Sequence, residues 1–169
     1  MPTIAAAFAI AGLLAVPVQS HSSGWELHPA SDGHGAALTF GEDDAVSYRF
    51  ECADDGVTVT ETGVTKLLDL KTGKAIGDDA GDAMPDGAAV MALFGGRGQP
   101  KFQPAQYAHN PVEGWDLTIR LPRGDRQLKS LVRSETMSLF TTGYTMAVVM
   151  DADSRAQWKA FFEACPAAG

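Results

Sequence analysis

Two widely separated cysteines constrain the fold of this chain more than any other feature. Cys52 and Cys165 are the only cysteines among 169 residues, and neither belongs to a C-x-x-C motif. Because a reactive redox pair needs neighbouring thiols, the pattern favours a structural disulfide, with two buried free thiols as the alternative. The bond would close a loop of 165 − 52 − 1 = 112 residues. The fold must then return the end of the chain to the segment around residue 52.

The N-terminus resembles an export signal. Residues Ile4 to Val18 form an apolar run that is followed by Gln19 and Ser20. This run is shorter than the roughly 20 residues that a membrane-spanning helix needs, and a small residue at Ser20 suits signal peptidase. We predict a signal peptide over residues 1–20 and a periplasmic or secreted product, where disulfides form. A buried N-terminal helix and a lipid-facing anchor are the alternatives.

Composition and charge describe the remaining segment, residues 21–169. Its 169 − 20 = 149 residues suit one domain with a hydrophobic core. No later apolar run approaches membrane-spanning length, so we expect no transmembrane segment in the mature chain. The chain holds 21 acidic and 13 basic residues, a net charge of −8 at pH 7. Such a surface repels phosphates, which excludes nucleic acid as the expected partner.

Alternating apolar and polar residues predict strands through most of the chain. Turn residues at Asp54–Gly56, Thr72–Gly73 and Thr142–Gly143 separate pairs of such segments and predict hairpins. The predicted strands are Val46–Cys52, Gly56–Thr62, Lys66–Leu70, Lys74–Ile76, Trp115–Leu121, Met137–Thr141 and Tyr144–Met150. The chain is therefore expected to be rich in antiparallel sheet.

Two segments near the C-terminus have helical spacing instead. Asp125 can cap a short helix that buries Leu128, Leu131 and Val132. Ser154 and Gln157 form a capping box ahead of a longer helix, which Pro166 ends. The apolar stripe of the second helix consists of Trp158, Phe161, Phe162 and Cys165. A disulfide from Cys165 would attach this helix to the sheet.

These elements predict an α+β fold that is predominantly antiparallel β and sandwich-like, with one or two C-terminal helices and one disulfide. Gly77–Gly87 and Gly95–Gln106 are rich in turn residues and are predicted to be long loops. The run Gly95–Gly98 lacks the pattern of a phosphate-binding P-loop, so a flexible loop is the preferred interpretation. Long loops are frequent places for binding residues.

Several residues are candidates for a ligand-binding surface. Trp115 and Trp158 belong to apolar stripes and are expected to pack in the core. Other aromatic and polar residues fit no stripe or lie in the predicted loop and turn segments. These candidates are Trp25, Arg97, Lys101, Tyr107 and His109, of which Tyr107 and His109 belong to a predicted turn over residues 107–111.

Two groups of residues could each form a metal site. The alternative for both groups is that their side chains are simply exposed to solvent. Cleavage after Ser20 would leave His21 at the N-terminus, where its amine and ring could bind copper. A second imidazole would come from His28, His34 or His109. Separately, four carboxylates could bind calcium, although the EF-hand spacing of glycine and glutamate is missing. They are Asp78, Asp79, Asp82 and Asp86.

The C-terminal segment supports a comparison with a known family. Residues Gln127 to Pro166 combine a short helix, a hairpin and a final helix that ends in cysteine. This order of elements resembles the ending of small exported proteins of alphaproteobacteria related to the invasion-associated locus B family. The resemblance implies a β-rich periplasmic or envelope protein, without established catalytic residues, that acts in contact with other cells. It transfers no functional residue to this chain.

The sequence contains no G-x-S-x-G or H-E-x-x-H motif. We therefore expect a non-enzymatic binding or interaction module of the envelope, whose partner is another envelope or cell-surface protein or a small ligand. One alternative is a periplasmic copper-binding protein that uses His21. The other is a hydrolase whose catalytic residues come together from separate loops.

Overall fold

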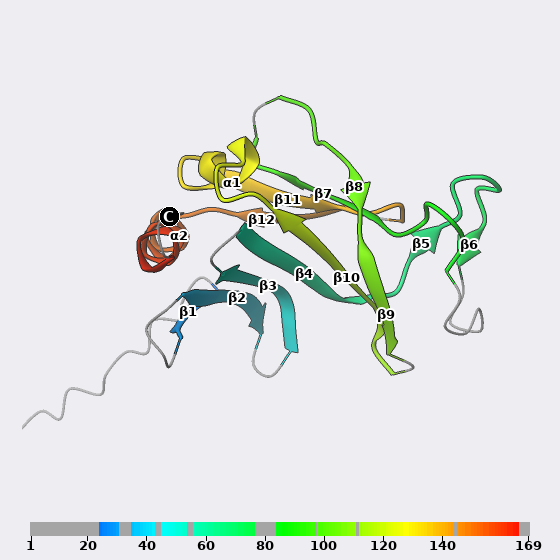
Figure 1. The fold of residues 1–169 in the computed structure, drawn as a ribbon, viewed down its shortest axis with the longest axis horizontal. Coiled ribbons are helices and arrows are strands. Elements are labelled where there is room, and N and C mark those ends of the chain that lie inside the picture. Colours follow the sequence, from blue (N-terminus) through cyan, green and yellow to red (C-terminus); the bar gives the residue numbers. More distant parts are fainter. Residues whose placement is uncertain are drawn as a thin grey trace, which may run out of the picture.

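A six-stranded antiparallel sheet forms one layer of the fold (Figure 1). The computed structural model describes residues 24–30, 35–42, 45–53, 56–76, 84–96, 98–110, 112–143 and 145–165. In spatial order the sheet contains β1 (Trp25–Pro29), β2 (Ala36–Glu42), β3 (Ala45–Ala53), β4 (Gly56–Val64), β10 (Gly114–Leu121) and β9 (Gln106–Asn110). The predicted signal peptide, residues 1–20, lies outside the described residues.

The second layer combines a smaller sheet with two helices (Figure 1). The four-stranded sheet contains, in order, β12 (Thr145–Val149), β11 (Thr136–Phe140), β7 (Val90–Phe94) and β8 (Gln103–Pro104). The helices are α1 (Arg126–Leu131) and α2 (Ala152–Ala164), and a small hairpin of β5 (Leu67–Leu68) and β6 (Ala75–Ile76) lies apart. Buried side chains of both sheets and both helices belong to one core. The predicted α+β, sandwich-like fold is confirmed.

The alternating residues lie on opposite faces of the larger sheet, as predicted. Tyr48, Phe50 and Cys52 of β3 are buried, whereas Arg49 between them is exposed. Val46 is an exception, because its side chain is 40% exposed. A register shift between Phe40 and Gly41 of β2 interrupts the pairing at this point and places Val46 opposite Gly41. The predicted hairpins β3–β4, β5–β6 and β11–β12 are all present.

Two segments that were predicted to be irregular contain strands. β8 lies inside the predicted loop Gly95–Gln106, and β9 begins at the last residue of that loop. β9 also replaces the turn predicted from Tyr107 onward, because Gln106–Asn110 pairs with β10. This correction gives the larger sheet its outermost strand.

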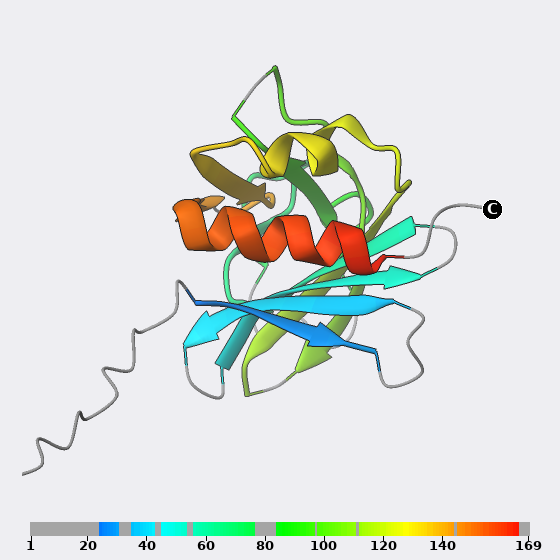
Figure 2. The same ribbon diagram turned by 90° about the vertical axis from the view of Figure 1, so that its left-hand side faces the viewer.

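Helix α2 lies along the larger sheet, between that sheet and α1 (Figure 2). Its buried stripe contributes Trp158 and Phe161 to an aromatic cluster with Trp25 and Phe50. The ring centroid of Trp158 lies 4.6 Å from that of Phe50 and 5.1 Å from that of Trp25. The predicted stripe is confirmed, and Phe162 forms its half-buried edge.

The disulfide joins the C-terminal end of α2 to β3, as the sequence predicted. Cys165 caps α2 and Cys52 lies near the end of β3, with their Cα atoms 5.7 Å apart. The backbone N–H of Ala36 donates a hydrogen bond to the Cys52 sulfur at 3.3 Å. The bond therefore connects the last helix to the centre of the larger sheet. No helix in the described part of the chain has the length and apolar character of a membrane span.

The cap of α2 differs from the prediction. The helix begins at Ala152, and Asp151 is its N-cap residue instead of Ser154. The Asp151 carboxylate accepts a hydrogen bond from the backbone N–H of Ser154 at 2.7 Å. Ser154 lies in the first turn and is fully buried. The capping-box prediction failed because Asp151, three residues earlier, is also a strong capping residue.

The variant Asp151→Asn should keep this cap and reduce the acid sensitivity of the protein. The Ser154 hydroxyl and backbone N–H favour the charged carboxylate and hold the pKa of Asp151 below its ordinary value. A carboxylate with a lowered pKa in the folded state contributes stability above its unfolded pKa, about 4, and loses it as the pH falls. Thermal unfolding measured from about pH 6 to pH 2 should show a smaller decline in Tm for the variant. An equal decline in both proteins would contradict this assignment.

Candidate functional site

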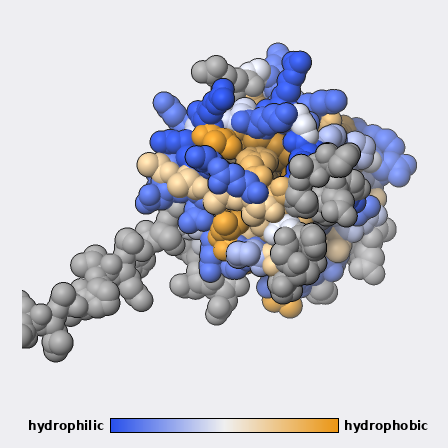
Figure 3. Space-filling view, turned by 60° about the vertical axis from the view of Figure 1, so that its left-hand side comes forward, coloured by the Kyte–Doolittle hydropathy of each residue, from blue (hydrophilic) through white to orange (hydrophobic). Residues whose placement is uncertain are grey.

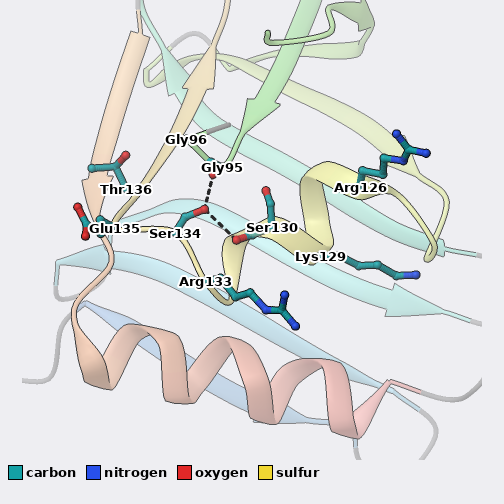
Figure 4. Close-up of a pocket in the computed structure, with 9 residues that line it drawn as sticks. All are labelled: Gly95, Gly96, Arg126, Lys129, Ser130, Arg133, Ser134, Glu135 and Thr136. Carbon is teal, nitrogen blue, oxygen red and sulfur yellow. Dashed lines mark hydrogen bonds between the residues drawn. The ribbon is translucent and has the colours of Figure 1, made fainter. Parts of the chain in front are cut away.

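Helix α1 presents basic side chains because its apolar residues anchor it to the core. Asp125 caps the helix by accepting a hydrogen bond from the Gln127 backbone N–H at 2.7 Å. Leu128 and Leu131 are fully buried. The exposed residues Arg126, Lys129 and Arg133 follow the helical repeat on the remaining surface. In Figure 4 these three side chains extend away from β7, and Arg133 lies on the side of α1 nearer to α2.

The hydroxyl of Ser134, which follows α1, joins this helix to the residue after β7. The hydroxyl of Ser130 donates to the Gln127 carbonyl at 2.8 Å. The hydroxyl of Ser134 is within hydrogen-bonding distance of the carbonyl oxygens of Gly95 and Ser130 (Figure 4). A side chain at Gly95 would meet Ser134 Oγ at 3.0 Å and Leu131 Cδ2 at 3.3 Å, so only glycine leaves room for this approach. The Ser134 hydroxyl therefore connects the end of α1 to Gly95, whereas the Ser130 bond lies within the helix.

Three hollows surround α1. They have volumes of about 650, 560 and 700 Å³. The first lies over Gly95, Ser130 and Ser134, the second lies beside the loop that carries Lys101, and the third lies between α1 and Phe162 of α2. Their sizes fall within the range of roughly 300–1,000 Å³ that is usual for small-molecule sites.

The side chains around these hollows are mostly basic. The cations are Lys101, Arg123, Arg126, Lys129 and Arg133, which we call the basic α1 surface. The carboxylates are Asp125 and Glu135. Five positive and two negative groups give a local charge of 5 − 2 = +3, whereas the whole chain carries −8. These residues therefore form a locally positive surface on an acidic protein, and such a surface attracts anions.

Arg123 lines the third hollow and carries buried hydrogen-bond donors. Both of its terminal nitrogens are buried, and neither has a hydrogen-bond partner among the described residues. Guanidinium groups carry donors in a planar fork that matches a carboxylate or a phosphate. The hollow is also lined by Gly124, Lys129, Val132, Arg133 and Phe162. It therefore combines cationic donors with an apolar wall.

The ligand-binding residues predicted from the sequence do not come together. Trp25 is 1% exposed and packs in the aromatic core, so its assignment to a binding surface is corrected. Lys101 lies beside Arg126 and Leu121, whereas His109 pairs with Trp115 at the opposite end of β10. Six residues of strand separate these ends by about 20 Å. Arg97 lies outside the described residues.

Tyr107 and His109 lie on the outermost strand, β9, where they cover a core tryptophan. The ring centroids of His109 and Trp115 are 4.4 Å apart, and those of Tyr107 and Trp115 are 5.8 Å apart. Trp115 is 1% exposed, while Tyr107 remains 44% exposed. Tyr107 and His109 are two positions apart on β9 and therefore lie on the same face of the strand, where both contact Trp115.

The described histidines cannot share one copper ion. His28 lies on β1 and His109 on β9, the two outermost strands of the larger sheet. Five strand spacings separate them by about 24 Å, so at most one of them could join His21. His28 also hydrogen-bonds Thr39, with 3.0 Å between Nε2 and Oγ1. His21 and His34 lie outside the described residues.

The proposed calcium ligands are mostly outside the described residues as well. These are Asp78, Asp79 and Asp82, whereas Asp86 is exposed in a turn. Within the described ranges, no group of three or more His, Cys, Asp or Glu side chains could hold a metal ion.

The basic α1 surface was not predicted from the sequence, although a signal for it exists. Arg123, Arg126 and Lys129 are spaced at three residues, and Arg133 follows one turn later. The helical repeat places Arg126, Lys129 and Arg133 on one face, and this face is exposed because Leu128 and Leu131 are buried. Comparisons with protein-family models, with curated proteins and with solved structures found no match for this chain.

Proposed function

We propose that this protein is an exported, non-enzymatic binding module of the cell envelope that recognises an anionic small molecule. Its predicted signal peptide and its disulfide fit an oxidising compartment outside the cytoplasm. The resemblance of its C-terminal segment to the invasion-associated locus B family agrees with this location. The proposal concerns the mature domain, residues 21–169.

The observation that carries the proposal is the basic α1 surface. Five cations surround three adjoining hollows in a chain whose net charge is −8. Capping by Asp125 and the burial of Leu128 and Leu131 fix the helix that carries Arg126 and Lys129. Cations of like sign around one hollow attract an anion together.

The arrangement of hydroxyl groups favours binding over hydrolysis. The hydroxyls of Ser130 and Ser134 donate hydrogen bonds to main-chain carbonyls, which are too weakly basic to activate them for nucleophilic attack. The described residues that line the three hollows include no histidine. His28 instead lines a separate hollow of about 460 Å³ on the outer face of the larger sheet.

A pair of matched charge reversals tests the proposed function. Arg126→Glu with Lys129→Glu changes the basic α1 surface, and Lys71→Glu with Lys74→Glu changes an exposed hairpin. Each pair moves the net charge from −8 to −8 − 4 = −12. Calorimetric titration with citrate should show affinity that falls about tenfold or more in the first variant, because two attractions become repulsions.

The hairpin variant should bind citrate nearly as well as the unmodified protein. Circular dichroism and thermal unfolding would first establish that both variants are folded. Equal weakening in the two variants would mean that only net charge matters. That result, or the absence of citrate binding to the unmodified protein, would contradict the proposed function.

A further inference from the structure

The hollow between α1 and α2 has the most apolar lining of the three. Its volume is about 700 Å³, and two apolar side chains line it, Val132 after α1 and Phe162 on α2. On the face that carries α1 and α2, apolar surface lies among hydrophilic side chains (Figure 3). Hydrophilic anions gain nothing from an apolar wall, whereas a molecule with an apolar body buries surface there.

The apolar wall has firm support from the core. Phe162 contacts Trp158, with 5.9 Å between their ring centroids, and it contacts Phe161 at 5.5 Å. Trp158 and Phe161 are both fully buried. The half-buried ring of Phe162 is therefore held in position and presents its remaining surface to the hollow.

Cations lie around the same hollow. Lys129 of α1 and Arg133, which follows the helix, line it together with Phe162 of α2. Arg123 adds two buried terminal nitrogens that lack a partner among the described residues. A buried donor without a partner is costly, and a carboxylate that accepts from it removes that cost. The donors and the apolar wall therefore favour one ligand that satisfies both.

We infer that this hollow binds an amphipathic carboxylate, a molecule with one carboxylate group and a short aliphatic body. The carboxylate accepts hydrogen bonds from Arg123 and Arg133 and is attracted by Lys129. The aliphatic body lies on Val132 and Phe162. This inference rests on the proposed function, because it names the class of anion that the basic α1 surface recognises.

Three probe molecules measure the separate contributions of the carboxylate head group and the aliphatic body to binding. Decanoate carries the head group and the aliphatic body, acetate carries the head group alone, and octyl glucoside is an uncharged amphiphile. Calorimetric titrations below the aggregation concentration of each amphiphile should show decanoate binding at least about tenfold more tightly than acetate, because each buried methylene strengthens binding several-fold. Octyl glucoside should bind at least about tenfold more weakly than decanoate.

Paired variants identify the hollow that is used. Lys129→Gln with Arg133→Gln should weaken decanoate binding about tenfold, whereas Lys71→Gln with Lys74→Gln should leave it unchanged. Val132→Thr keeps the shape of the side chain and replaces a methyl group with a hydroxyl. It should weaken decanoate binding by about threefold and leave acetate binding unchanged.

Failure of this inference can be distinguished from failure of the proposed function. If acetate and decanoate bind equally, or if octyl glucoside matches decanoate, the amphipathic carboxylate is excluded. Decanoate binding that is insensitive to Lys129→Gln with Arg133→Gln would also exclude it. Citrate binding that still depends on Arg126 and Lys129 would then preserve the proposed function.

Discussion

Replacing Cys52 and Cys165 with alanine should lower the free energy of unfolding by about 4–5 kcal/mol. The disulfide joins residues 113 positions apart, and the chain-entropy model assigns roughly this value to a loop of such length. Chemical denaturation of the mature domain would measure the difference. The expected fall in Tm is about 8–20 °C for a domain of this size.

Reduction provides the control for this prediction. A reductant should destabilise the unmodified protein to a similar extent, and it should not affect the variant without cysteines. A loss below about 1 kcal/mol would show that the bond adds little to folding and would contradict the role assigned to it.

Truncation of Trp158 to alanine should cost about 3–5 kcal/mol, because it leaves a large cavity in the aromatic cluster. The side chain is fully buried and contacts Trp25, Phe50 and Phe161. Its contacts with Trp25 and Phe50 join α2 to β1 and β3 of the larger sheet. Urea denaturation of both proteins would measure the change in unfolding free energy.

Val149→Ala is the matched control for that truncation. Val149 is 73% exposed on β12, so its replacement should change the stability by less than about 0.5 kcal/mol. If Trp158→Ala costs no more than this control, α2 does not depend on the aromatic cluster for its position.

The sequence predicted those elements whose two faces differ in environment. β3, β4 and β10 alternate because one face is buried, and α1 and α2 show a helical stripe for the same reason. β9 was missed because its residues Gln106–Ala108 are all exposed and show no alternation of burial. Its position depends on pairing with β10, which a local pattern does not encode. The fold class was nevertheless predictable.

The candidate site was predictable only in part. Lys101 was identified, but its neighbours on the basic α1 surface were not. Residue 101 is distant from α1 in the sequence, and only the path of the folded chain brings the two together. The Gln127 side chain donates to the Gln99 carbonyl at 3.4 Å and marks this approach. The predicted loop Gly95–Gln106 does contribute Lys101 to the site. Trp25 was assigned to a surface because the buried face of β1 was not recognised.

An amide NMR titration of the ¹⁵N-labelled mature domain with citrate would test the central proposal most directly. If the basic α1 surface binds the anion, saturable shifts should be confined to residues around the three hollows, at Gly95, Lys101 and Phe162 and from Leu121 to Thr136. The amides of the basic hairpin around Lys71 and Lys74 should not change. Shifts that are spread over both regions, or shifts at the hairpin alone, would contradict a binding site on α1.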